Sequence, residues 1–203
     1  MNVELLDKLT AAIEAKDGST IRAILLKENP TDASNVLIRF NENEICIILS
    51  ILDNDTAANI ILELPDDIRA NVLTELADES ILGIIEELDS DDAADLISSL
   101  DEEKSKEILK GMNPRDSSEV QTLLQYSEDS AGGIMQTELV QVKDSSLVKD
   151  AINWIRLVAD DVPDFYQIYV TNENDKLVGI ISLKSLILAG PSSTVKSIMQ
   201  PIK

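Results

Sequence analysis

The sequence predicts a mainly α-helical protein, in which a superhelical array of short helices precedes a small α/β module. Two observations predict the array: apolar residues recur every twelve residues from about position 40 to position 124, and acidic residues stand between them. A third observation marks the change of fold, because the residues after Leu124 form short runs typical of strands. The 203 residues are enough for two small domains, each with its own core.

The repeat has three apolar registers. The first register comprises Phe40, Leu52, Leu64, Leu76, Leu88, Leu100, Met112 and Leu124. The second and third registers lie eight and nine residues later, starting at Ile48 and Leu49, and the third is broken by Gln121. Together these spacings give i, i+1 and i+4, which is one face of a helix. Each repeat therefore predicts one amphipathic helix.

Helix-start signals separate the apolar clusters. Asp and Asn cap the free amides of a first helical turn, and Pro favours the same position. Such signals occur at the segments starting with Asp53, Pro65, Ala77, Asp89, Asp101 and Asn113. Each unit is thus a helix of about nine residues and a tight turn, which is too short to be stable alone and must stack on its neighbours. Residues 1–39 predict one or two further helices.

The acidic charge is concentrated in the repeat. The net charge of the chain is −21, and residues 41–103 carry 19 Asp and Glu against one basic residue, Arg69. This charge repels nucleic acid and anionic lipid and attracts cations. Most of these carboxylates are expected to be caps and solvated surface. The densest cluster is residues 89–95, where Asp91 and Asp95 share one helix face and repel each other unless a cation lies nearby.

Several classes of function are disfavoured by the composition. The chain has no histidine, no phosphate-binding loop and no credible pair of nucleophile and base, so an enzyme is not expected. The single cysteine, Cys46, lies in an apolar run and is expected to be a buried structural thiol. The N-terminus lacks the features of a signal peptide, and no apolar run reaches the ~18 residues that span a bilayer. The chain as given is expected to be soluble.

A second module follows the repeat. Gly132 and Gly133 predict either a turn with positive φ or a close approach of the backbone. The pattern beyond them predicts a β-α-β-β-α unit, with its elements at about 139–142, 147–158, 166–170, 177–182 and 183–189. Residues Val195–Pro201 begin another element.

Two parts of the chain resemble known families. The segments IYVTNENDKLVGIISLKSLI and VKSIM resemble a CBS domain, and the latter lies where a second CBS domain would begin. The junction YSEDSAGGIM and the acidic DDAAD run resemble the MgtE family of magnesium transporters. The resemblance covers nearly the whole chain. It implies an acidic helical domain at 1–127 and one CBS-like module at 128–203, with the rest of the protein missing from this truncated chain.

The resemblance also implies a function. The chain would be the cytosolic Mg²⁺-sensing regulatory region of a homodimeric magnesium channel or transporter in the cell membrane. Mg²⁺, with Ca²⁺ and Mn²⁺ as alternatives, would hold the compact state in which the pore is closed. Its partners would be divalent cations and the remainder of its own chain, namely a second CBS domain and the transmembrane pore domain. No nucleic-acid partner is expected.

The family's metal sites match this sequence in part. The resemblance implies Asp91, Asp95 and Gly133 as metal-site residues. A further acidic family position corresponds to Asn59, which is neutral, so that site is absent or shifts to Asp55 or Glu63.

Two alternatives to the sensor remain. One is an acidic helical scaffold for protein interactions, which resembles the helices of flagellar motor switch proteins. The other is a soluble CBS regulator that binds an adenosine nucleotide. This second alternative is disfavoured because Lys184 and Ser185 stand where nucleotide-binding relatives carry an Arg-Asp pair.

Overall fold

The computed structural model describes residues 3–127, 130–159, 162 and 165–202. The chain divides into two compact units, Met1–Met135 and Gln136–Lys203. The described part of the glycine-containing junction therefore belongs to the helical unit. The sequence-based boundary lies a few residues earlier, after residue 127.

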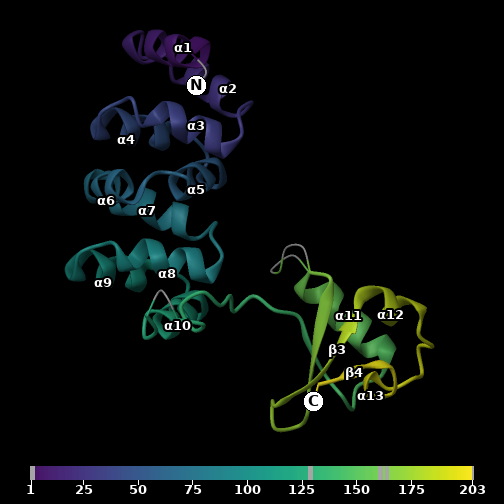
Figure 1. The fold of residues 1–203 in the computed structure, drawn as a ribbon. Helices are drawn as coiled ribbons and strands as arrows, with labels where there is room; N and C mark the ends of the chain where they lie inside the picture. The colour runs from purple at the N-terminus through teal and green to yellow at the C-terminus, as the bar shows by residue number, and fades with distance from the viewer. Residues whose placement is uncertain (1–2, 128–129, 160–161, 163–164, 203) are drawn as a thin grey trace. The chain divides into compact units, whose positions relative to one another are not determined.

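The first unit is built of short helices, which Figure 1 shows stacked in the order of the chain. They are α1 (Val3–Glu14), α2 (Gly18–Leu25), α3 (Pro30–Leu37), α4 (Glu42–Ile51), α5 (Asn54–Leu62), α6 (Asp66–Glu75), α7 (Asp78–Ile85), α8 (Ser90–Ser98), α9 (Glu102–Gly111) and α10 (Pro114–Leu123). The predicted superhelical array of short helices is confirmed. The expectation of one or two helices before residue 40 is wrong, because α1, α2 and α3 all precede it.

The helix starts explain this difference. Helices α2 to α10 each follow an N-cap residue, and these residues are spaced by twelve: Asp17, Asn29, Asn41, Asp53, Pro65, Ala77, Asp89, Asp101 and Asn113. Most of them accept a hydrogen bond from a backbone N–H in the first turn, as an N-cap does. The repeat thus begins at Asp17, two units before the predicted start.

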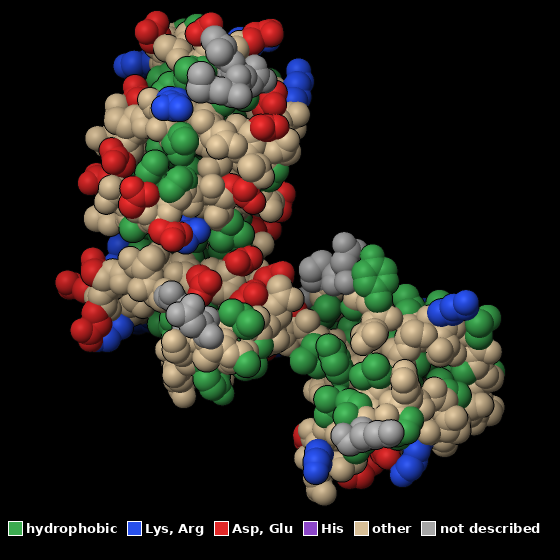
Figure 2. Space-filling model, viewed as in Figure 1, with side chains coloured by type: hydrophobic (Ala, Val, Ile, Leu, Met, Phe, Trp, Pro, Cys, Tyr) green, Lys and Arg blue, Asp and Glu red, His purple; other side chains and the backbone are tan. Residues whose placement is uncertain are grey.

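The helices pack in an alternating pattern. Most helices contact the next but one along the chain, as in the pairs α2 with α4, α3 with α5, α4 with α6, α5 with α7, α7 with α9, and α8 with α10. Their shared core is aliphatic, and the second register is fully buried from Ile48 to Val120. Burial of these faces supplies the stability that helices of eight to ten residues lack alone. Figure 2 shows acidic side chains scattered over the outer surface of this unit.

The second unit is a small α/β module. Its elements are β1 (Gln141–Lys143), α11 (Val148–Val158), β2 (Gln167–Thr171), β3 (Leu177–Ser182), α12 (Leu183–Leu188), α13 (Val195–Ile198) and β4 (Gln200–Pro201). The sheet has the order β1-β2-β3-β4. The predicted β-α-β-β-α order is confirmed.

The sheet's pairing follows from its connections. Strands β1 and β2 are parallel because α11 crosses between them, whereas β2 and β3 form an antiparallel hairpin. Helices α11 and α12 bury Ala151, Ile155 and Leu186 in the core that includes Ile168 of the sheet. The segment expected to begin another element forms α13 and β4, and β4 pairs with β3.

Candidate cation site at the start of helix α8

The start of α8 gathers four carboxylates within seven residues. Asp89 is the N-cap, Asp91 and Asp92 lie in the first turn, and Asp95 follows one turn later. The helix forms here because its other face, which includes Ala93 and Ala94 and extends through Leu96 and Ile97, is buried in the core. The positive end of the helix dipole favours the carboxylates at the N-cap and in the first turn. Local structure thus places three of the four acids at one end of the helix, with Asp95 one turn further along.

Asp91 has an unusual environment within this cluster. Its residue is half-buried, and its Oδ1 atom is buried with no hydrogen-bond partner among the described residues. A buried carboxylate oxygen without a hydrogen-bond partner is unfavourable. It has lost its hydration, and no donor or positive charge in the folded protein compensates for that loss. A cation, or a water molecule held by one, would remove this penalty.

The pKa of the neighbouring Asp92 is also affected by this cluster of negative charges. Burial raises the pKa of Asp92, and the negative charges of Asp91, Asp89 and Asp95 raise it further. The positive charge of Arg69 lowers it. Sequence reasoning did not single out Asp92, although it lies in the same acidic run. Its half-buried position depends on packing, which the run does not reveal.

Arg69 cannot neutralise this cluster by itself. Its guanidinium donates one hydrogen bond to the carbonyl oxygen of Leu62 at 3.2 Å. It also forms an ion pair with Asp66, with Nη2 2.6 Å from Oδ1. Much of its hydrogen-bonding capacity is therefore committed to α6 and the end of α5.

The sequence-predicted site residues are brought together in part. Asp91 and Asp95 lie one turn apart on α8, and Asp95 is exposed. Gly133 lies in the same compact unit, and its backbone N–H donates to the carbonyl oxygen and the hydroxyl of Ser130 at 3.0 and 3.2 Å. Within the described ranges, no group of three or more acidic or cysteine side chains is arranged to hold a metal.

The possible second site near Asn59 has its oxygen atoms engaged. The side-chain amide of Asn59 donates to the carbonyl oxygen and to Oδ1 of Asp55, at 2.8 and 3.2 Å. The hydroxyl of Thr31 donates to Oε2 of Glu63 at 2.8 Å. Both candidate carboxylates thus accept internal hydrogen bonds, and a cation would have to replace or share these partners.

The glycine junction makes a close approach. A Cβ atom on Gly132 would lie 2.5 Å from ring carbons of Tyr126. Among the described glycines none has a positive φ. Of the two predicted roles for the glycine pair, the close approach is right and the positive-φ turn is wrong.

The position expected to bear nucleotide-binding residues is a helix cap. Ser182 is the N-cap of α12, and its hydroxyl oxygen accepts a hydrogen bond from the backbone N–H of Ser185 at 3.1 Å. The two serine hydroxyls are 2.8 Å apart. No carboxylate stands at this cap.

Comparison with known proteins identifies the family. Residues 28–129, about half of the chain, match the family model described as the MgtE intracellular N domain. The chain belongs to the MgtE family. The predicted resemblance to this family is thereby confirmed. No described helix has the length and apolar character needed to cross a membrane.

Individual relatives agree with this membership. The magnesium transporter MgtE of Thermus thermophilus is 40% identical over 84 residues, which are 41% of this chain and 19% of that protein. The MgtE of Bacillus subtilis is 36% identical over 80 residues, or 39% of this chain and 18% of that protein. The matched stretch is thus about a fifth of these MgtE transporters. The relatives are described as transporters, which points away from catalysis.

Two solved structures share the fold. A crystal structure of the cytosolic domain of the Mg²⁺ channel MgtE in complex with ATP matches with a TM-score of 0.86 at 30% identity, covering 97% of this chain and 80% of that one. The soluble part of a magnesium transporter matches with a TM-score of 0.75 at 23% identity, covering 97% and 77% of the two chains. The second likeness shows the fold alone.

Proposed function

We propose that this chain is the cytosolic Mg²⁺-sensing regulatory region of a magnesium channel or transporter. The observation that carries the proposal is the buried, unpartnered Oδ1 atom of Asp91 within a cluster of carboxylates on α8. Membership of the MgtE family supports Mg²⁺ as the cation that balances this charge.

The proposed ligands are the carboxylates of Asp91 and Asp95 and the backbone of Gly133. Mg²⁺ binds oxygen ligands, keeps several waters and commonly uses one or two carboxylates. A hydrated Mg²⁺ beside Asp91 would supply the donor that its Oδ1 atom lacks. Ca²⁺ and Mn²⁺ also prefer oxygen ligands, so selectivity between them is a matter for measurement.

The proposed mechanism is a shift between compact and open states. A cation that binds the compact state stabilises it, whereas unbalanced carboxylates repel when the cation is withdrawn. In the full protein, which we propose to be a homodimer with this region on the cytoplasmic side of the membrane, compaction would close the pore. The second CBS domain and the pore domain would be its partners within the same chain.

A melting experiment tests the cation site. The melting temperature and hydrodynamic radius are measured with and without Mg²⁺, using NaCl at equal ionic strength as control. At a concentration 100 times the dissociation constant, Mg²⁺ should stabilise the folded state by about 2.7 kcal/mol. Asp91→Asn and Asp95→Asn should each remove most of this gain.

The repeat supplies a matched control variant. Glu103 occupies the position in α9 that Asp91 occupies in α8, twelve residues later, and it is exposed. Glu103→Gln removes the same charge and should leave the Mg²⁺ response unchanged. An equal loss of response in Glu103→Gln and Asp91→Asn would mean that Mg²⁺ acts by general screening, and the proposed site would be wrong.

Binding of an adenosine nucleotide is a second candidate function. It is favoured by the MgtE relative whose cytosolic domain was crystallised with ATP. Lys184 is a basic residue at the expected position, but Ser185 offers a hydroxyl engaged in a cap rather than a carboxylate. Calorimetric titration with ATP, using Lys184→Met as the variant, tests this function independently of Mg²⁺ sensing.

A further inference from the structure

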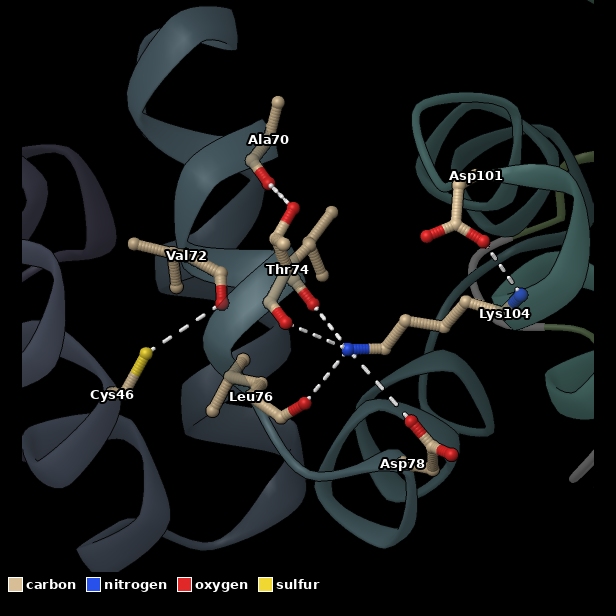
Figure 3. A network of polar contacts seen from close by, with 9 residues as sticks. Cys46, Ala70, Val72, Thr74, Leu76, Asp78, Asp101 and Lys104 are labelled. Carbon is tan, nitrogen blue, oxygen red and sulfur yellow. Dashed lines mark hydrogen bonds and ion pairs between the residues drawn. The ribbon is translucent and has the colours of Figure 1, made fainter.

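The side chain of Lys104 ends in a cage of oxygen atoms contributed by two other helices. Its Nζ atom donates hydrogen bonds to the carbonyl oxygens of Leu73, Thr74 and Leu76, at 2.8, 3.1 and 2.9 Å. Oδ1 of Asp78 lies 3.7 Å away. Figure 3 shows the side chain extending from α9 to the end of α6 and the start of α7. The ammonium group thus uses all three of its N–H bonds on backbone oxygens.

The carbonyl groups in this cage belong to the end of α6. Leu73 and Thr74 lie in its last turn, and Leu76 is its C-cap. Such carbonyls have no partner within their own helix, and the helix dipole makes this end negative. Helix α6 has no basic residue in its last turn. Lys104 therefore supplies the cation that the last turn of α6 itself lacks.

Burial makes the arrangement specific. The Lys104 side chain is only 16% exposed. A buried ammonium group is strongly unfavourable unless hydrogen bonds replace its hydration, and here they do. Because the oxygens are backbone atoms at a fixed helix end, the cage does not depend on flexible side chains.

We propose that this oxygen cage is a monovalent-cation site that the chain fills with its own ammonium group. Carbonyl oxygens at these distances are the ligands that proteins use for K⁺, and ammonium has a similar size and charge. The tethered cation clamps α9 to α6 and α7 without any dissolved ion. Removal of the side chain should therefore create a site for free ammonium or K⁺. This inference concerns different residues from the proposed Mg²⁺ site and does not rest on it.

The test is chemical rescue of Lys104→Ala in the full chain. Melting is followed by circular dichroism in chlorides of N-methylglucamine, K⁺, ammonium and methylammonium at equal ionic strength. In N-methylglucamine, which is too large for the cage, the helical unit should melt about 4–10 °C below the wild type. Ammonium and K⁺ should restore part of this loss with saturable dependence, and the wild type should not distinguish these salts.

Two further variants separate a cation site from a general loss of packing. Lys106→Ala removes an exposed lysine of the same helix, which pairs with Glu102, and should show neither the loss nor the rescue. Lys104→Met keeps the aliphatic stem, which blocks entry of an ion, so it should be destabilised in every salt. If Lys104→Ala folds only when ammonium or K⁺ is present, the proposal is also supported. The proposal would be overturned if Lys104→Ala melted at the same temperature in all the salts. It would also be overturned if this variant folded in none of them.

Discussion

The carboxyl group of Asp92 lies close enough to that of Asp91 for the two charges to interact. Burial is the largest cause that raises the pKa of Asp92, and the charge of Asp91 is the next. Because the pKa in the folded state exceeds the ordinary value of 3.8, this group favours folding below pH 3.8. That contribution is lost as the pH rises through the raised pKa.

Replacing Asp92 should therefore stabilise the metal-free protein at neutral pH. Asp92→Asn should melt above the wild type at pH 7, and the difference should vanish toward pH 4. Because Asp92 is half-buried, solvent screening reduces this gain. The measurement is melting temperature against pH in the presence of a chelator. Asp116→Asn, at the equivalent but exposed position of α10, is the control. An identical effect of both variants would contradict the prediction.

The N-cap of α5 should make the opposite contribution to pH dependence. Asp53 accepts hydrogen bonds from the side chain and backbone of Thr56, and these bonds lower its pKa to about 2. The stabilising contribution is complete above the ordinary pKa of 3.8 and is lost as the pH falls toward 2.

Replacement of this cap tests the sign of the effect. Asp53→Ala should cost about 1 kcal/mol at pH 7, measured by chemical denaturation, and less at pH 2. Asp53→Asn keeps a capping oxygen without the charge, so at pH 7 it should lose less than Asp53→Ala, and its stability should lack the loss at low pH that protonation of Asp53 causes. A loss in Asp53→Asn as large as that in Asp53→Ala would show that the charge, including its pairing with Arg22, matters more than the cap.

The pairing of β4 depends on a glycine in β3. A Cβ atom on Gly179 would lie 2.8 Å from both the backbone oxygen of Gln200 and Sδ of Met199. The backbone oxygen of Gln200 cannot relieve this clash by a change of rotamer, as a side chain could. Gly179→Ala should therefore destabilise the second unit by about 1–3 kcal/mol. Hydrogen exchange should show faster exchange at β4. Gly190→Ala, where the nearest atom is the Ser193 hydroxyl at 3.4 Å, is the control.

The single cysteine should react slowly in the folded protein. Cys46 is half-buried, and its Sγ atom lies 3.5 Å from the carbonyl oxygen of Val72. Burial raises the pKa of the thiol above 9.0, and the nearby charge of Glu75 raises it further. We expect alkylation by iodoacetamide at pH 7 to be at least ~10-fold slower in the native protein than in denaturant. Equal rates would mean that the thiol is freely accessible in the native state.

Much of the helical unit could be predicted because helix starts are local. An N-cap oxygen bonds an N–H only two or three residues away, so Asp53 and Asp101 are recognisable from their immediate sequence. The same signal was present at Asp17, Asn29 and Asn41. The earlier units were missed because the first apolar register breaks at Glu28, although the third continues back through Leu37 and Leu25.

The sequence by itself determined the twelve-residue repeat, its caps, the excess of negative charge and the change to an α/β module. Only the tertiary structure decided which carboxylate oxygens lose contact with water and which helix end the ammonium group of Lys104 reaches. The neighbours of Lys104 are set by a contact between helices far apart in the chain, α9 with the end of α6, which the spacing does not encode. Lys104 reaches carbonyl oxygens 28 to 31 residues away, whereas the capping interactions stay within one turn. Burial results from such long-range contacts. It is burial that makes the charges of Asp91 and Lys104 costly unless a partner compensates for the lost hydration.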